Sequence, residues 1–265
     1  MSTQVLKRKL SAAAFLRKSR LIVGLDIAAN MARTPGNDPR AEKDRLEKEA
    51  LRIISATAEY AVAFKFNHQL VLPLGVFDRI PVLIQKIHDN GLAAIMDAKI
   101  NDIGNTNAQI ARYYFDAGFD AVIANPMVGW EGGLDSVFEA ARKRQRGVIT
   151  LCYMSHPAAN EGYGLNVATD EKMKTHEPLY AIFARRAKAW NADGVIVGAT
   201  YPDKIREVKK ILGEDVPIIS PGVGAQGGSA KEAIAAGASY VIAVRSIVEA
   251  PDPAAAAKAL VAETR

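Results

Sequence analysis

Residues 92–106 read LAAIMDAKINDIGNT. The apolar run Leu92–Met96 predicts a short buried strand, and charged residues follow it directly. Side chains alternate along a strand, so Asp97 and Lys99 should point to the same side, while Asp102 lies in the loop beyond. Taken alone, a D-x-K-x-x-D pattern is also compatible with a salt bridge at a strand end. The rest of the chain decides between a structural and a functional interpretation of this cluster.

The same pattern repeats from residue 21 onward: a short apolar strand, a loop and an amphipathic helix. Strands are predicted at residues 21–25, 61–66, 92–96, 119–124, 147–151, 194–197, 216–219 and 240–243. Helices are predicted at residues 40–59, 76–89, 104–117, 131–144, 177–190, 202–212, 229–236 and 252–263. Apolar strands rich in Val and Ile are typical of a parallel sheet covered on both faces. Strict alternation over this length predicts an α/β fold of the (β/α)8 TIM barrel type, with a doubly wound open sheet as the alternative.

The first twenty residues form a basic segment without an acidic residue. Its cations are Lys7, Arg8, Lys9, Arg17, Lys18 and Arg20. We expect residues 1–20 to form an extra N-terminal helix that closes the bottom of the barrel, and residues 21–265 to form a single barrel domain. A targeting peptide is the alternative, but the first strand starts at once, with no spacer or obvious cleavage site. A nucleic-acid-binding arm is a third alternative that rests on charge alone.

Composition narrows the class of protein further. Of the 265 residues, 49% are apolar, which is enough for a sizeable core, and no apolar run reaches the roughly 18 residues that span a bilayer. The single cysteine, Cys152, cannot form an internal disulfide, so we expect a cytoplasmic, reducing location. The four histidines lack the spacing of metal ligands, so we expect no metal site. The formal charge of +5 favours anionic partners in general.

Polar residues collect where the predicted strands end. They are Asp26, Lys65, Asp97, Lys99, Asn125, Ser155, Thr200, Gln226 and Arg245. The strands themselves are almost purely apolar. Barrel enzymes carry their active sites at the C-terminal ends of the strands, so this contrast predicts an active site there. Cys152 also closes a strand, but no base stands beside it in the sequence, and we interpret it as a small apolar residue.

A second motif, SPGVGAQGGS at residues 220–229, follows the seventh predicted strand. Its four glycines allow the backbone to approach a ligand closely, and it leads into a helix N-terminus, which favours anions. Arg245 follows the eighth strand. The loops after strands 7 and 8 are the usual phosphate site of barrels, so we predict phosphate binding here. The motif is not a dinucleotide fingerprint, because no G-x-G-x-x-G follows the first strand.

The segment DAKINDIGNT at residues 97–106 resembles the signature of the orotidine 5′-phosphate decarboxylase family. MSHP at 154–157, GVIVGAT at 194–200 and PGVGAQGG at 221–228 are similar to the archaeal-type members. The resemblance covers almost the whole barrel. Related barrels that act on sugar phosphates share only D-x-K-x-x-D, without the continuation. The complete charged set also argues against a catalytically silent nucleotide-binding barrel.

The resemblance implies conversion of orotidine 5′-phosphate to UMP and CO2 in pyrimidine biosynthesis, without metal or organic cofactor. Lys99 would protonate C6 of the pyrimidine, within a charge network completed by Asp97, Asp102 and Lys65. A homodimer is implied, in which Asp102, Ile103 and Thr106 reach into the neighbouring active site. The implied substrate-binding residues are Asp26, Lys65, Asp97, Ile103, Thr106, Ser155, Pro221, Gly222, Gly224, Gln226, Val244 and Arg245.

Within that set, the resemblance implies that Asp26 and Lys65 hold the ribose hydroxyls and that Ser155 contacts the pyrimidine edge. Gln226, Arg245 and backbone N–H groups of the two phosphate loops would hold the 5′-phosphate. Residues 155–175 are our candidate for a mobile lid. No nucleic-acid or membrane partner is expected. The nearest alternative is a magnesium-dependent sugar-phosphate decarboxylase or aldolase of the same superfamily, which would lose activity in EDTA.

Overall fold

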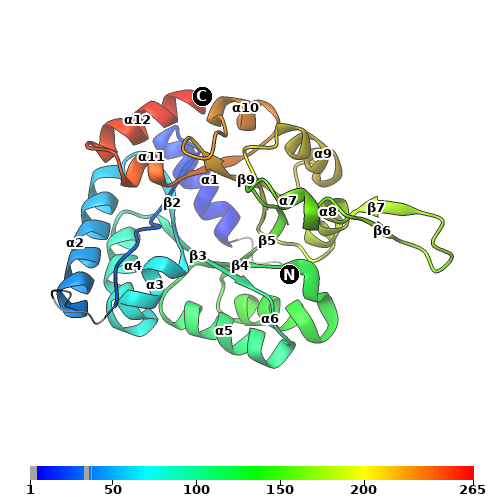
Figure 1. Cartoon of the computed structure of the whole chain (residues 1–265), viewed down its shortest axis with the longest axis horizontal. Helices are drawn as coiled ribbons and strands as arrows, with labels where there is room; N and C mark the ends of the chain where they lie inside the picture. Colours follow the sequence, from blue (N-terminus) through cyan, green and yellow to red (C-terminus); the bar gives the residue numbers. More distant parts are fainter. Residues whose placement is uncertain (1–4, 33–35, 37) are drawn as a thin grey trace.

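Eight parallel strands close into a barrel in the computed structural model, which describes residues 5–32, 36 and 38–265 (Figure 1). Around the barrel the strands follow the order β1-β10-β9-β8-β5-β4-β3-β2. Their bounds are β1 Leu21–Gly24, β2 Ala61–Phe66, β3 Ala93–Ile100, β4 Ala121–Ala124, β5 Gly147–Tyr153, β8 Gly194–Val197, β9 Ile218–Val223 and β10 Tyr240–Ala243. Because β1 pairs with both β2 and β10, the predicted (β/α)8 barrel is confirmed and the open sheet is excluded.

Helices surround the barrel and connect its strands (Figure 1). Their bounds are α2 Pro39–Thr57, α3 His68–Leu74, α4 Ile80–Asp89, α5 Gly104–Asp116, α6 Asp135–Lys143, α8 Leu179–Ala189, α9 Pro202–Leu212, α10 Ala230–Ala235, α11 Arg245–Val248 and α12 Pro253–Glu263. Three short helical segments are not α-helical. They are the π-helical turns η1 Gly75–Arg79 and η3 Trp130–Leu134 and the 3-10 turn η2 Pro126–Val128. Helix α12 starts as predicted, because Asp252 accepts hydrogen bonds from two N–H groups of the first turn and Pro253 fits the first helical position.

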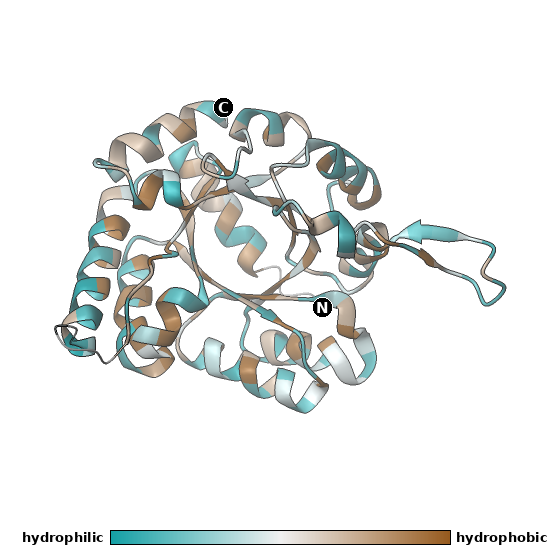
Figure 2. Cartoon of the chain, in the orientation of Figure 1, coloured by the Kyte–Doolittle hydropathy of each residue, from teal (hydrophilic) through white to brown (hydrophobic). Residues whose placement is uncertain are grey.

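The strand sequences are explained by burial on both faces. Every residue of β1, β2, β4, β5 and β10 is buried, so side chains that point into the barrel and side chains that point at the helices both leave water. Such strands are continuously apolar, without alternation. Figure 2 shows the apolar residues along the barrel strands and the polar residues on the outer helices. Within the described residues, no helix is both long and apolar enough to cross a membrane.

Helix α1, Val5–Arg17, lies across the N-terminal end of the barrel (Figure 1). Leu6 and Leu10 are fully buried against the barrel. Its polar contacts are Lys7 Nζ to the Asp215 carbonyl (2.9 Å), Lys9 Nζ to Asp120 Oδ1 (3.0 Å), and Arg17 to the carbonyls of Ala58 (2.9 Å) and Asn90 (2.7 Å). All four partners lie just before strands. The helix therefore covers the end of the barrel opposite the predicted active site; residues 1–4 lie outside the described part.

Several predicted boundaries differ from the structure by two residues or more, among them those of two strands and one helix near the site. The strand at 92–96 continues to Ile100, because the chain resumes pairing with β4 after a register shift beyond Met96. The helix predicted from residue 76 begins eight residues earlier, at His68, and is interrupted by the wide turn η1 after Pro73. The strand predicted at 216–219 starts two residues later and continues to Val223, so it includes the first part of the glycine-rich motif.

The long loop after β5 contains structure that the sequence pattern did not reveal. A short helix, α7 Ala159–Gly162, is followed by strands β6 Asn166–Ala168 and β7 His176–Pro178, which form an antiparallel hairpin. The hairpin projects from the barrel (Figure 1), and no residue in its strands is fully buried. It is mostly hydrophilic (Figure 2), so it carries no apolar periodicity that would predict strands. The movement expected of this lid candidate stays a prediction.

Candidate active site

A buried lysine joins two aspartates at the C-terminal end of the barrel. Lys65, in β2, is 5% exposed, and its Nζ lies 2.9 Å from Asp26 Oδ1 and 3.4 Å from Asp97 Oδ2. Asp26 follows β1 and Asp97 belongs to β3, the two strands that flank β2. One ammonium is thus neutralised by carboxylates from both neighbouring strands, which is what makes its burial possible.

Asp97 also binds the lysine two residues further on. Its Oδ1 lies 2.7 Å from Nζ of Lys99, so the predicted orientation of both side chains toward one side is confirmed. Burial alone would raise the pKa of Asp97, but the charges of Lys65 and Lys99 and their hydrogen bonds outweigh it and hold the pKa below its usual value. Asp97 is therefore an ionised carboxylate between two ammonium groups at neutral pH.

The backbone at Lys99 is strained. Its φ is +48°, in the left-handed region that L-residues other than glycine, asparagine and aspartate rarely adopt. The strain coincides with the register shift between β3 and β4, which lies between Met96 and Ile100. Such an irregularity turns a side chain away from the direction that regular pleating would give it. Strain of this kind persists where the surrounding structure imposes it, and it concentrates at functional sites.

These charged groups line one wall of a cavity of about 180 Å³. The cavity also takes in Ser155, Pro221, Gly222, Gln226 and Val244 of the predicted set. Its apolar lining comes from Ile123, Leu151, Met154, Ile196 and Ile242. An apolar lining keeps the local dielectric low, so the fixed charges act strongly on a bound molecule. The cavity thus combines apolar side chains with the ammonium of Lys99.

Ser155 is held in place by the end of β8 and the loop after it. Thr200 Oγ1 donates to the Ser155 carbonyl at 3.0 Å, and the Tyr201 hydroxyl donates to the His156 carbonyl at 2.9 Å. Gly198 must lack a side chain, because a Cβ there would lie 2.6 Å from the Ser155 Cα. Serine side chains have one donor and two acceptor positions, so this one can serve either edge of a heterocycle.

The glycine-rich loop lies beside Arg245, as predicted. Gly222 and Gly224 have φ of +96° and +76°, which explains the need for glycine. The guanidinium of Arg245 reaches the Ala225 carbonyl at 3.3 Å. The N–H of Gly224 donates to the Gly228 carbonyl at 2.9 Å, so it is used within the loop. Arg245 and Gly224 do not line the cavity, but Arg245 contacts the loop that contributes Gln226, and Gly224 belongs to that loop.

Asp102, Ile103 and Thr106 do not meet the charged groups in the single chain. All three are exposed, and none lines the cavity. Their segment is nevertheless well ordered by hydrogen bonds, since the side chain of Asn107 accepts from the Asp102 N–H at 2.9 Å and donates to the Gly133 carbonyl at 3.0 Å. The structure therefore brings together one part of the predicted site and leaves this part pointing outward.

One polar lining residue, Asn67, was not singled out from the sequence. Asn67 follows β2 and donates to Asp26 Oδ2 at 3.4 Å, the oxygen that also accepts from Lys65 Nζ at 3.0 Å, so it adds a second donor to this carboxylate. Its position two residues after Lys65 was the signal that could have revealed it. Cys152 is fully buried and burial raises the pKa of its thiol, which confirms that it is a packing residue. In the described part of the chain, no group of three metal-ligating side chains comes together.

Comparison with known proteins agrees with this geometry. The model of the orotidine 5′-phosphate decarboxylase / HUMPS family matches residues 19–260. The chain belongs to this family. The orotidine 5′-phosphate decarboxylase of Pyrococcus abyssi is 38% identical over 220 residues, which cover 83% of this chain and 94% of that protein.

Two solved structures have the same barrel fold as this chain. That of Leishmania donovani OMP decarboxylase has a TM-score of 0.79 and 28% identity, covering all of this chain and 98% of that one. That of the Methanocaldococcus jannaschii decarboxylase, in complex with the inhibitor BMP, has a TM-score of 0.74 and 26% identity, covering 93% and 99%. The family resemblance drawn from residues 97–106 is therefore confirmed, and the named relatives are carboxy-lyases.

Proposed function

We propose that this protein converts orotidine 5′-phosphate to UMP and CO2, without metal or organic cofactor, and that Lys99 delivers the proton to C6. The observation that supports this most directly is a series of three ion pairs, Asp26–Lys65, Lys65–Asp97 and Asp97–Lys99. All four residues line the cavity together with apolar side chains. Family membership and the named relatives support the substrate.

The chemistry fits the residue types. When the bond between C6 and the carboxylate breaks, both electrons stay on C6, where the ring stabilises them poorly. A fixed ammonium in a low-dielectric cavity stabilises that negative charge. The same ammonium then transfers a proton to C6, which forms UMP and leaves a neutral amine to be reprotonated from solvent. Asp97, at 2.7 Å from Nζ, fixes the direction in which Lys99 points.

The remaining groups match the other parts of the substrate. In this proposal Asp26 and Lys65, which line the cavity, hydrogen-bond the ribose hydroxyls, and Ser155, which lines it together with the apolar residues, contacts the pyrimidine edge. Gln226, Arg245 and the backbone N–H groups of Gly222 and Val244 would hold the 5′-phosphate, while Pro221 and Gly224 would shape the loop around it. Phosphate binding far from C6 can drive closure over the substrate and so contribute to the rate.

The proposed enzyme is a homodimer in which Asp102, Ile103 and Thr106 complete the partner's site. Ile103 is 70% exposed, an unfavourable position for an isoleucine at a monomer surface. Other exposed apolar side chains lie on neighbouring elements, namely Leu72, Phe77 and Tyr113. Phe77 packs edge-on against Tyr113 at 5.8 Å, which joins η1 and α5 into one apolar surface. A second copy would bury this surface.

The test of the reaction is the loss of pyrimidine absorbance after addition of orotidine 5′-phosphate in EDTA, for wild type and Lys99→Ala. Turnover by the wild type with nearly complete loss in the variant is expected. The sugar-phosphate alternative predicts the reverse pattern: no turnover of orotidine 5′-phosphate, and activity on a sugar phosphate that EDTA abolishes and magnesium restores.

The shared site is tested by mixing two inactive variants, Lys99→Ala and Asp102→Ala, and letting their subunits exchange. If Asp102 acts in the neighbouring site, each mixed dimer regains one intact site, so random exchange restores about a quarter of the wild-type activity. If both residues act within one chain, the mixture stays inactive. Sedimentation of the wild type at micromolar concentration checks the dimer independently.

A further inference from the structure

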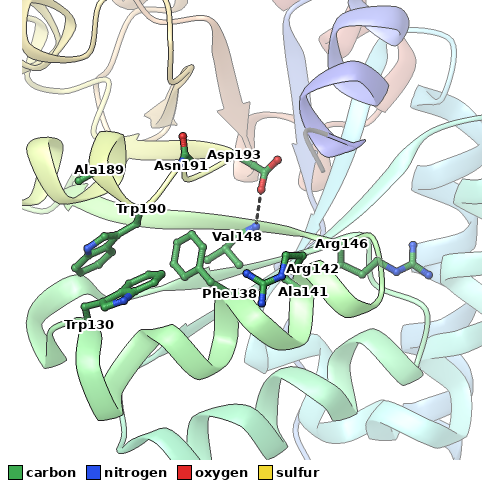
Figure 3. A pocket seen from close by; sticks show the side chains of 10 residues that line it. All are labelled: Trp130, Phe138, Ala141, Arg142, Arg146, Val148, Ala189, Trp190, Asn191 and Asp193. Carbon is green, nitrogen blue, oxygen red and sulfur yellow. Dashed lines mark hydrogen bonds between the residues drawn. The ribbon is translucent and has the colours of Figure 1, made fainter. Parts of the chain in front are cut away.

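A second pocket lies outside the barrel, between α6 and α8 (Figure 3). Its volume is about 260 Å³, and it shares no residue with the active-site cavity. Arg146 and Asp193, at its inner side, directly precede β5 and β8, so this part of the pocket belongs to the N-terminal end of the barrel. We call it the α6–α8 groove.

One end of the α6–α8 groove is an aromatic wall. The rings of Trp130 and Trp190 lie 5.2 Å apart and are tilted by 33°, and Phe138 packs 5.3 Å from Trp130 (Figure 3). Trp130 remains 40% exposed. Trp190 lies against Trp130 and also has the Arg186 guanidinium 5.9 Å from its ring centroid, so Trp130 is the ring that another aromatic ring can reach. Stacking on an indole contributes energy beyond that of area burial alone. These are the only two tryptophans in the sequence.

The rest of the groove supplies charged and polar groups. Arg142 is exposed and lies between the aromatic wall and Arg146 (Figure 3). Asp193 is 7% exposed and accepts one hydrogen bond from the Val148 N–H at 3.0 Å. Its other oxygen, Oδ1, has no donor among the described residues. Buried carboxylate oxygens are normally satisfied, so this one calls for a donor from outside the chain.

We propose that the α6–α8 groove binds a flat nitrogen heterocycle that carries an anionic group. The ring stacks on the wall formed by Trp130, Phe138 and Trp190, and the anion pairs with Arg142, whose guanidinium presents several N–H donors in one plane. An N–H group of the ring or of a bridging water satisfies Asp193. The volume is slightly below the usual range of small-molecule pockets, about 300–1,000 Å³, and suits a molecule no larger than a mononucleotide.

Tryptophan emission gives a direct test, because both tryptophans line this groove and neither lines the active site. The probes are nitrogen heterocycles that carry different anionic groups: the mononucleotides AMP and UMP carry a phosphate, and orotate carries a carboxylate. We expect saturable quenching by at least one of them, with a Kd of about 1 mM or tighter. Which one saturates at lower concentration distinguishes phosphate from carboxylate. Quenching by inorganic phosphate at equal strength would overturn the proposal, since the ring would then contribute nothing.

Three variants locate the effect. Arg142→Ala should weaken the quenching about tenfold, because it removes the exposed partner of the anion. Arg144→Ala is the matched control, since Arg144 lies two residues away, pairs with Asp116 and does not line the groove. Arg245→Ala should leave the quenching unchanged. Quenching that disappears in Arg245→Ala would originate in the active site and would overturn the proposal, as would the absence of saturable quenching by any probe.

Discussion

Asp97 and Asp120 lie at opposite ends of the barrel and are equally buried, each 8% exposed. Burial on its own would raise the pKa of either group. At Asp97 the two lysines outweigh burial, and at Asp120 the hydrogen bond from His88, the charge of Lys9 and the Ala94 N–H do so. Both are thus ionised carboxylates among cations, and neither burial nor charge distinguishes them.

What distinguishes them is the freedom of their partners. Asp120 is surrounded by Lys9 (3.0 Å), Arg146 (2.9 Å), His88 (2.9 Å) and the Ala94 N–H (2.8 Å), which tie four elements together. Asp97 instead faces a cavity, and its partner Lys99 has a side chain that is 35% exposed on a strained backbone. The network around Asp120, in which every partner is already bound, stabilises the fold. The ammonium of Lys99 remains accessible to a ligand and can take part in a reaction.

The largest effect is expected for Lys99→Ala. We expect kcat/KM for orotidine 5′-phosphate to fall on the order of 10³–10⁴-fold, because the variant loses both the charge and the proton donor. The melting temperature should change little, since Lys65 still neutralises Asp97. If activity is lost together with a large drop in melting temperature, Lys99 stabilises the fold as the Asp120 network does, and the two ends of the barrel do not differ in role.

Asp120→Ala should show the opposite pattern. Its removal leaves several cations without their common carboxylate, and breaking such a buried network costs about 3–5 kcal/mol of unfolding free energy. Activity per folded molecule should stay within about twofold, because Asp120 lies at the other end of the barrel. Urea unfolding measures the first quantity and steady-state kinetics the second. Asp116→Ala, which removes an exposed ion pair with Arg144, is the control and should cost at most about 1 kcal/mol.

Asp193 sharpens the comparison, because it precedes β8 as Asp120 precedes β4 and also accepts from the neighbouring strand. Among the described residues no cation forms an ion pair with it, and burial raises its pKa from 3.8 to about 6, against smaller opposing effects of the Val148 N–H and Lys7. A raised pKa stabilises the fold below about pH 4, and this contribution is lost as the pH rises through about 6.

The loss amounts to about 3 kcal/mol, at 1.36 kcal/mol per pKa unit. Asp193→Asn should remove this part of the pH dependence, so that the variant gains stability relative to wild type between pH 4 and pH 7. Urea unfolding at several pH values measures the difference. An equal difference at every pH would mean that the carboxyl does not titrate in this range.

The smallest effect is expected for Lys9→Ala. The side chain of Lys9 is 28% exposed, and Arg146 and His88 remain on Asp120, so we expect a loss of about 1 kcal/mol. A double-mutant cycle with Arg146→Ala would show whether the cations around Asp120 act as one network. Strict additivity would reduce that network to independent pairs.

The sequence predicted what depends on local pattern. The apolar strands predicted the barrel, because burial on both faces is visible in the local sequence. The contact between Asp97 and Lys99 was expected from alternation along a strand, but the backbone at Lys99 departs from regular strand geometry. The left-handed φ of Lys99 was not predictable, since it follows from a register shift against β4. Asp120 and Asp193 were missed for a similar reason: their partners are 26 to 111 residues away in the chain.

The closure of the barrel also sets an order of events during synthesis. Leu21 pairs with Val241, and Lys7 bonds to the Asp215 carbonyl. At about 5–20 residues per second, the ribosome adds Val241 roughly 10–45 s after Leu21. During that interval one edge of β1 has no partner, and the contact of Lys7 with Asp215 cannot form until late in synthesis. The strand that opens the barrel is therefore completed on its second edge only when the last strand has been made.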